Sequence, residues 1–145
     1  MIQRIQSIFL LIASVSFFSL FYFPFAKSDK TATPLFQDQI FNINDHILLL
    51  IFTVLGGVIS LGAIFLFRNR LLQKRLGILG IISAIFIGAV SFWLMFDEGN
   101  QIDNSVEISD QAGLFMPAVS LVMIALANYF ISKDEKLVSS MDRLR

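Results

Sequence analysis

The chain has no cysteine and only one histidine among its 145 residues. Without cysteine, disulfides, thiolate metal sites and thiol nucleophiles are excluded, and a single histidine excludes HExxH and other multi-histidine metal sites. The glycines cluster within apolar runs and not in a loop after a strand, so no nucleotide-binding fingerprint is present. Eleven basic and eleven acidic residues cancel, which gives no reason to expect a nucleic-acid partner. We therefore expect no cofactor, no metal and no catalytic residue.

Charge is absent from four long stretches of the sequence. Residues 5–26, 46–67, 76–96 and 111–132 contain no Asp, Glu, Lys or Arg, and they are 22, 22, 21 and 22 residues long. At about 1.5 Å per residue, each would form a helix of roughly 33 Å, close to the ~30 Å hydrocarbon core of a bilayer. Hydrophobic residues make up 56% of the chain. The pattern predicts an all-α membrane protein, a single bundle of four transmembrane helices.

We expect the four spans at about 7–25, 46–67, 76–96 and 113–132. The first apolar run also fits a signal peptide, because Arg4 precedes it. It is longer than the roughly 7–15 apolar residues of a signal peptide, and residues 24–27 make a poor cleavage site. We therefore expect an uncleaved first span.

The stretch between the second and third spans sets the orientation. Residues 68–75 carry four cationic side chains, and a short basic loop of this kind stays on the cytoplasmic side. The inner segments then hold nine bases and three acids, whereas the outer loops, residues 26–45 and 97–112, hold two bases and eight acids. We predict a multi-pass protein of the bacterial inner (cytoplasmic) membrane with both termini in the cytoplasm.

The two outer loops contain short alternating stretches. Residues 39–43 alternate polar and apolar side chains, as do residues 105–109. Alternation is typical of strands, so the two stretches are predicted to pair in a small β-ribbon outside the membrane. Asn44 or Asp45 is expected to cap the second span, because either side chain can accept from the free amides of a helix start.

Small residues recur at three- and four-residue spacing within the second and third spans. Such stripes let helices approach closely, because packing holds helices together in lipid. We expect an antiparallel hairpin that is packed along these stripes, and homodimerisation through the third-span stripe is the alternative. The helix-packing candidates are Gly56, Ser60, Ala63, Gly80, Ala84 and Gly88.

No span contains an ionisable Asp, Glu, Lys or Arg. Charge within a membrane is costly and usually marks a path for ions or protons, so its absence speaks against a proton-coupled transporter. The polar residues of the fourth span are Ser120 and Asn128, which could line a small cavity gated near Pro117. Asn128 is more simply explained as a hydrogen-bonding contact between helices.

The basic hinge and the tail are candidates for docking a partner. Leu137, Met141 and Leu144 recur at i, i+4 and i+7, which predicts an amphipathic cytoplasmic helix in the tail, residues 133–145. It would lie on the membrane surface or against the hinge. The cations of the hinge are Arg68, Arg70, Lys74 and Arg75.

Three stretches of the chain resemble one family of small membrane proteins. They are the start MIQRIQSIFLL, the hinge FRNRLLQKR at residues 67–75 and the ending DEKLVSSMDRLR at residues 134–145. Together they resemble an uncharacterised family found in Bacteroidota, domain of unknown function family 4293. The resemblance covers the whole chain and implies a four-span inner-membrane protein. It brings no activity and no catalytic residues.

Two functions fit these features. The first is a non-enzymatic accessory, assembly or interaction subunit that binds a membrane protein partner, or a second copy of itself, within the lipid bilayer. The alternative is a small transporter or lipid-handling protein with a cavity between the four helices. An enzyme is disfavoured, because no pair of nucleophile and base and no metal-ligand set occurs at either membrane face.

Overall fold

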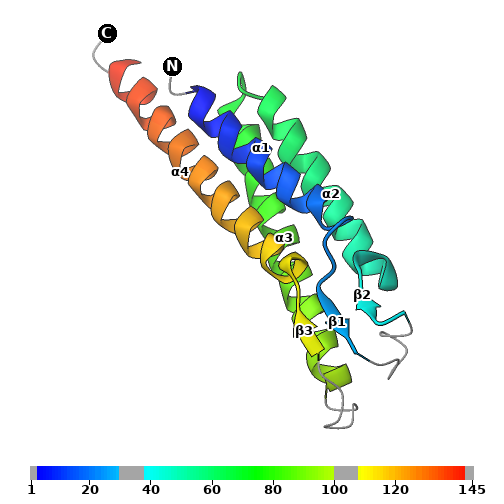
Figure 1. Ribbon diagram of the computed structural model, residues 1–145. Helices are drawn as coiled ribbons and strands as arrows, with labels where there is room; N and C mark the ends of the chain where they lie inside the picture. The colour runs from blue at the N-terminus through cyan, green and yellow to red at the C-terminus, as the bar shows by residue number, and fades with distance from the viewer. Residues whose placement is uncertain (1–2, 30–37, 100–107, 143–145) are drawn as a thin grey trace.

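The computed structural model describes residues 3–29, 38–99 and 108–142, most of which are helical. The four α-helices are α1 (Gln3–Ser19), α2 (Ile47–Phe65), α3 (Arg70–Gly99) and α4 (Met116–Asp142). They lie side by side in an elongated bundle (Figure 1). One end holds the start of α1, the turn between α2 and α3, and the end of α4; we call it the termini end. The other end holds a small sheet, and we call it the sheet end.

Each helix packs extensively against two neighbours, in the closed order α1, α2, α3, α4 and back to α1. Within the described part of the chain, three helical segments are long and apolar enough to cross a membrane, and a fourth, Ile5–Ser19, is apolar but shorter. Those three are Ile47–Phe65, Arg70–Asp97 and Ala112–Leu137. The prediction of a bundle of apolar helices is confirmed.

The first helix is shorter than the span predicted at 7–25. It ends at Ser19, where Phe23 N donates to Ser19 O and the chain turns. Proline has no amide to continue a helix, so Pro24 fits this change of direction. Phe25 N then donates to Phe41 O, and the chain enters the sheet.

The hinge is mostly helix and not a loop. Leu66 to Asn69 form the turn after α2, and α3 begins at Arg70. The Asn69 side chain accepts from Leu72 N at 3.2 Å, which satisfies an amide of the first turn. Because this cap starts the helix at Arg70, residues 70–75 form the first turns of α3, ahead of the apolar run that begins at residue 76.

Residues 133–142 of the predicted tail belong to α4 and do not form a separate helix. Helix α4 continues without a break to Asp142, where the prediction ended the span at residue 132. Neither glycine nor proline follows Pro117 in this helix to interrupt it. Asp134, in the predicted tail, is buried against α1 through Gln6. Packing against α1 thus extends α4 beyond the apolar run.

The sheet has three short strands, β1 (Ala26–Ser28), β2 (Ile40–Phe41) and β3 (Ile108–Asp110). Their order is β2-β1-β3, and both pairs are antiparallel. The predicted ribbon paired the segments of β2 and β3 directly, and this is wrong because β1 lies between them. The remaining part of the predicted second stretch, residues 105–107, lies outside the described residues.

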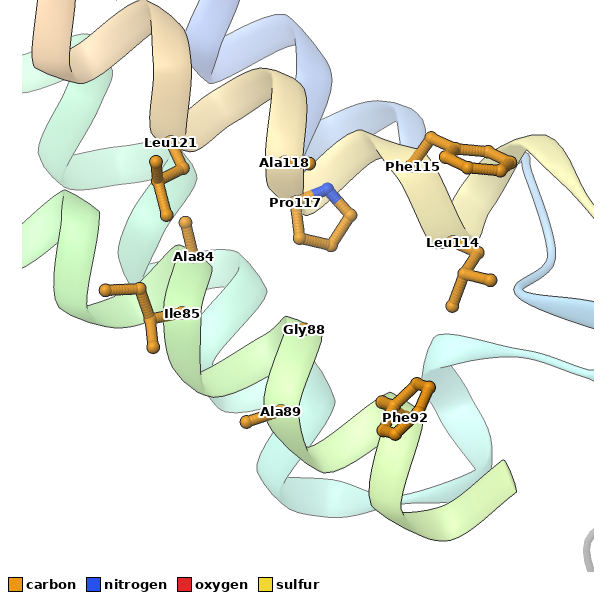
Figure 2. Close-up of a pocket in the computed structure, with 10 residues that line it drawn as sticks. All are labelled: Ala84, Ile85, Gly88, Ala89, Phe92, Leu114, Phe115, Pro117, Ala118 and Leu121. Carbon is orange, nitrogen blue, oxygen red and sulfur yellow. The ribbon is translucent and has the colours of Figure 1, made fainter. Parts of the chain in front are cut away.

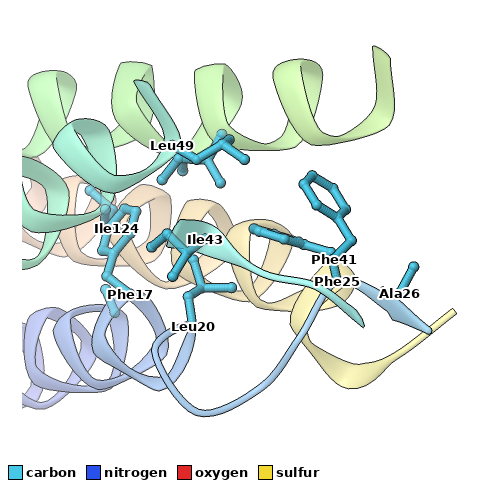
Figure 3. Close-up of a cluster of buried hydrophobic side chains, with 11 residues drawn as sticks. Phe17, Leu20, Phe25, Ala26, Phe41, Ile43, Leu49 and Ile124 are labelled. Carbon is cyan, nitrogen blue, oxygen red and sulfur yellow. The ribbon is translucent and has the colours of Figure 1, made fainter. Parts of the chain in front are cut away.

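The main core lies where the sheet meets the helices (Figure 3). Phe25 and Phe41 pack with their rings tilted by 36° and their centroids 5.1 Å apart, and both are fully buried. Phe17 of α1 and Leu49 of α2 extend this core into the bundle. A sheet of such short strands is not stable by itself. Burial of these large apolar side chains against the helices stabilises it.

Helix α2 is capped neither by Asn44 nor by Asp45, the two residues that were predicted. His46 is the N-cap of α2, and its Nδ1 accepts from Leu48 N. Asp45 instead belongs to the 3-10 helix Ile43–Asp45 and accepts from the Asn42 amide. Burial raises the pKa of Asp45 above its ordinary value; the hydrogen bond from Asn42 opposes this, and the negative charge of Asp38 adds to it.

Candidate functional site

An apolar groove lies between α3 and α4. It has a volume of about 530 Å³ and lies toward the sheet end (Figure 2). Helix α3 contributes Ala84, Ile85, Gly88, Ala89 and Phe92, and the chain around the start of α4 contributes Leu114, Phe115, Pro117, Ala118 and Leu121. We call this the α3–α4 groove.

Small side chains leave the groove open where the two helices face each other. The nearest atom to a Cβ at Gly88 would be Pro117 Cβ, at 3.9 Å, which is only an ordinary contact. Ala89 and Ala118 are exposed and too short to fill the space. Phe92 and Phe115 stand at its sheet-end side, 66% and 61% exposed. The result is a hollow open to the side of the bundle.

The lining of the groove limits its chemistry. None of its side chains carries a hydrogen-bond donor, an acceptor or a titratable group. Such a surface binds apolar groups by burial and dispersion, and it supplies no acid, base or nucleophile. Within the described residues, no group of three or more His, Cys, Asp or Glu side chains could hold a metal ion.

The predicted packing stripes meet partners on three different helices. A Cβ at Gly56 would lie 2.7 Å from the Phe17 ring of α1, so this glycine makes room for α1 and not for α3. Ser60 Oγ would lie 3.4 Å from a Cβ at Gly80, which places these two at the α2–α3 contact. The Gly80 position also meets Ile124 of α4.

The other members of the stripes differ in exposure. Ala63 and Ala84 are buried, and Gly88 is half-buried at the groove. The third-span stripe therefore faces α4 as well as α2. Helices α2 and α3 do pack against each other, but the stripes serve other contacts too. Part of the second-span stripe contacts α1, and part of the third-span stripe contacts α4.

Asn128 and Ser120 do not line the groove. Asn128 packs onto the backbone of Gly77, where a Cβ would lie 2.7 Å from Asn128 Nδ2. Its Oδ1 is buried and has no hydrogen-bond partner among the described residues, as is the case for Thr53 Oγ1 and Ser60 Oγ. Ser120 Oγ donates to Met116 O within α4. The structure thus places Asn128 at a close contact between α3 and α4.

The predicted docking cations lie around the start of α3. Arg68 and Arg75 are exposed, and Lys74 is half-buried. Arg70 Nη1 donates to Asp134 O at 3.1 Å, which joins α3 to α4. Arg70 is therefore engaged within the bundle.

The predicted apolar positions of the tail are only partly described. Leu137 is 48% exposed on α4. Met141 lies in α4, but its side chain and all of Leu144 are outside the described residues. The amphipathic face that these three would form stays a prediction.

Three polar residues at the termini end were missed by sequence reasoning. Gln6 Nε2 donates to Asp134 Oδ2 at 2.6 Å, and Asp134 is only 7% exposed. Gln73 Nε2 donates to Ala63 O at 3.0 Å, at the end of α2. The sequence held a signal for Asp134. It stands at i+7 from Ala127 and i+3 from Ile131, on the helix face that these two residues bury.

Comparison with known proteins identifies the family. The family model described as Domain of unknown function (DUF4293) matches residues 2–144, and the chain belongs to this family. The predicted family membership is thereby confirmed. No curated protein and no solved structure matches the chain.

Proposed function

We propose that this member of the DUF4293 family crosses the inner membrane of a bacterium four times, with both termini in the cytoplasm. Three helices have the required length and apolar character. Helix α1 has 17 residues, roughly 26 Å, and the exposed aromatics Phe21, Tyr22 and Phe23 follow it as an interfacial belt would. The basic residues of the termini end support a cytoplasmic position for it.

Fusing a reporter to the C-terminus tests this orientation. A fluorescent protein that folds only in the cytoplasm should fluoresce, and alkaline phosphatase, which needs export, should stay inactive at the same position. Active phosphatase at the C-terminus would refute the orientation without affecting the assignment of the helices.

We further infer that the chain is a non-enzymatic interaction subunit that receives a transmembrane helix of a partner protein in the α3–α4 groove. The apolar groove is the observation that carries this proposal. Its small residues, Ala84, Gly88 and Ala118, allow a third helix to approach closely, and close approach is what stabilises helix pairs in lipid. The groove offers no group for catalysis, which supports a binding role.

A lipid-handling role is the second candidate, because the same groove also suits an acyl chain. Its volume of about 530 Å³ falls in the range of small-ligand sites, and its wholly apolar lining would exclude a headgroup. A polar transport cavity at Ser120 and Asn128 is less well supported, since both side chains pack within or between helices.

Substitutions at two glycines, one in the groove and one outside it, test both functions and control for nonspecific effects. Gly88→Leu would place a side chain in the groove, whereas Gly62→Leu makes the same change on α2, where nothing lies within 4 Å of a Cβ. Both variants and the wild type are purified by tag from native membranes in mild detergent. Bound proteins and lipids are then identified by mass spectrometry.

A stoichiometric protein that is lost with Gly88→Leu but kept with Gly62→Leu supports the interaction subunit. A lipid that is enriched on the wild type, with no protein, and lost only with Gly88→Leu supports lipid handling. If neither variant changes what is bound, the groove is not the binding site, and both proposals fail.

A further inference from the structure

A second, polar hollow lies on α4 near the termini end. It has a volume of about 210 Å³ and is lined by Tyr129, Ser132, Lys133 and Lys136. These residues stand at i, i+3, i+4 and i+7, so they share one face of the helix. The hollow therefore presents a phenol, a hydroxyl and two ammonium groups together. We call it the α4 cationic site.

The two cations of this site are available to a ligand. Lys133 and Lys136 are exposed, and neither makes an ion pair with any residue that the structure describes. The adjacent carboxylate of Asp134 points away from them, since it is buried and accepts from Gln6 of α1. Glu135 follows Asp134 on the chain and lies about 100° around the helix from Lys136. The positive charge of the site is thus not neutralised by its buried neighbour.

The tyrosine of the site is held by an aromatic chain across two helices. Tyr129 packs edge-on against Phe130 at 5.5 Å, and Phe130 stacks on Phe9 of α1 at 5.6 Å. The Tyr129 side chain is nevertheless 62% exposed. A ring that is fixed at its base and free at its hydroxyl is suited to the level of the lipid headgroups.

The position of the site along α4 matches the surface of a membrane. Lys133 is the first charged residue after 22 uncharged ones, so it stands where the apolar run ends. In the proposed orientation this is the cytoplasmic leaflet, and lipid phosphates lie at that depth. Basic hollows between or beside helices on this side bind anionic headgroups.

We propose that the α4 cationic site binds the phosphate of an anionic phospholipid from the cytoplasmic leaflet. The two ammonium groups pair with the phosphate charge, and the hydroxyls of Ser132 and Tyr129 donate to its oxygens. This inference rests on the membrane orientation proposed above, and it does not depend on the groove or its partner. Free phosphate has the same chemistry and is the competing ligand to distinguish.

The test measures lipid binding to the full-length protein in detergent by native mass spectrometry. Phosphatidylglycerol and phosphatidylcholine with identical acyl chains are the two probes. The site variant is Lys133→Gln with Lys136→Gln. The matched control is Arg68→Gln with Arg75→Gln, which removes two exposed charges from the same end of the bundle but outside the site. Thermal unfolding of all variants verifies that they are folded.

The wild type and the control should prefer phosphatidylglycerol, and the site variant should bind it more weakly by about fivefold per lysine removed. Tyr129→Phe with Ser132→Ala, which changes no charge, should also weaken it. An equal loss in the arginine control, or no preference between the two lipids, would overturn the proposal. Displacement of the lipid by millimolar inorganic phosphate would assign the site to free phosphate and refute the lipid assignment.

Failure of this inference can be told apart from failure of the proposed orientation. If the reporter fusions place the C-terminus in the cytoplasm but phosphatidylglycerol is not preferred, only the α4 cationic site is refuted. If the reporters place it outside, the orientation fails, and a phosphatidylglycerol preference would then have to arise at the outer leaflet, contrary to this proposal.

Discussion

Replacing Gly113 with alanine should destabilise the protein strongly, because this glycine touches the backbone of another segment. Gly113 lies in the 3-10 helix Ala112–Phe115 (η3), just before α4, and its amide donates to Pro24 O at 3.0 Å. A Cβ at this position would collide with the carbonyl oxygens of Phe23 and Pro24, and it would lie 2.7 Å from Pro24 C. Its φ is not positive, so lack of space and not backbone conformation requires glycine.

The expected magnitude follows from these contacts. Overpacking typically costs about 1–3 kcal/mol, and here the obstructing atoms are backbone, which cannot swing aside as a side chain can. Separating the two segments would also weaken the hydrogen bond to Pro24, at about 1 kcal/mol. Gly113→Ala should therefore lower the free energy of unfolding by roughly 2–4 kcal/mol.

Gly62→Ala is the matched control. Nothing lies within 4 Å of a Cβ at Gly62 in α2, so the same change meets no obstacle there. Alanine should instead stabilise the helix by roughly 0.5–1 kcal/mol. Unfolding by sodium dodecyl sulfate in mixed micelles, followed by circular dichroism, measures both variants. If Gly113→Ala is as stable as Gly62→Ala, the close approach of η3 to Pro24 is refuted.

Three further changes test the interior and the sheet end. Gly77→Ala should destabilise the wild type by about 1–3 kcal/mol but should be tolerated in an Asn128→Ala background, and additive effects in a double-mutant cycle of unfolding would contradict their contact. Asp134→Ala should cost about 1–3 kcal/mol by leaving Gln6 without its acceptor, whereas Asp134→Asn, which keeps an acceptor oxygen, should cost less in the same assay. Because the pKa of Asp45 is raised, the folded protein holds this proton more tightly than the unfolded chain. Its penalty is absent at low pH and appears as pH rises from the ordinary carboxyl pKa through the raised one, so Asp45→Asn should remove that part of the loss of stability on thermal unfolding between pH 3 and 7, and an unchanged profile would refute it.

Charge spacing predicted where helices lie but not where they end. The apolar runs match α2, α3 and α4 because a bilayer-length run without charge has few alternatives to helix. The ends depend on single hydrogen bonds that spacing does not encode. Asn69 starts α3 before its apolar run, and the contact of Asp134 with Gln6 keeps α4 helical beyond its own run.

The sheet was predicted only in part, because its central strand has no sequence signal. Ala26, Lys27 and Ser28 form β1 with three residues, too few for alternation to be recognised. Its partners come from residues about fifteen and eighty positions later in the chain. Pairing over such distances is decided by how the four helices bring the loops together, and this information appears only in the folded structure.

The groove was not predicted either, although two of its lining residues were named as helix-packing candidates. Ala84 and Gly88 were expected to lie at a tight helix contact, since small residues permit close approach. A small residue allows a close contact but does not ensure one. At Gly80 the neighbouring Ile124 fills the space, whereas at Gly88 the facing residue is Pro117, whose ring leaves a gap. Whether a small residue becomes a contact or a hollow depends on the side chain opposite.

The position of the groove follows from how α4 is held. At the termini end, Asp134 joins α4 to Gln6 of α1 and to Arg70 of α3. At the sheet end, the segment before α4 is bonded to the chain after α1, through Gly113 and Pro24. Between these points, the facing surfaces of α3 and α4 at the groove are apolar. A helix or an acyl chain can therefore enter there by replacing apolar contacts with apolar contacts, without breaking a hydrogen bond and with both ends of α4 still anchored.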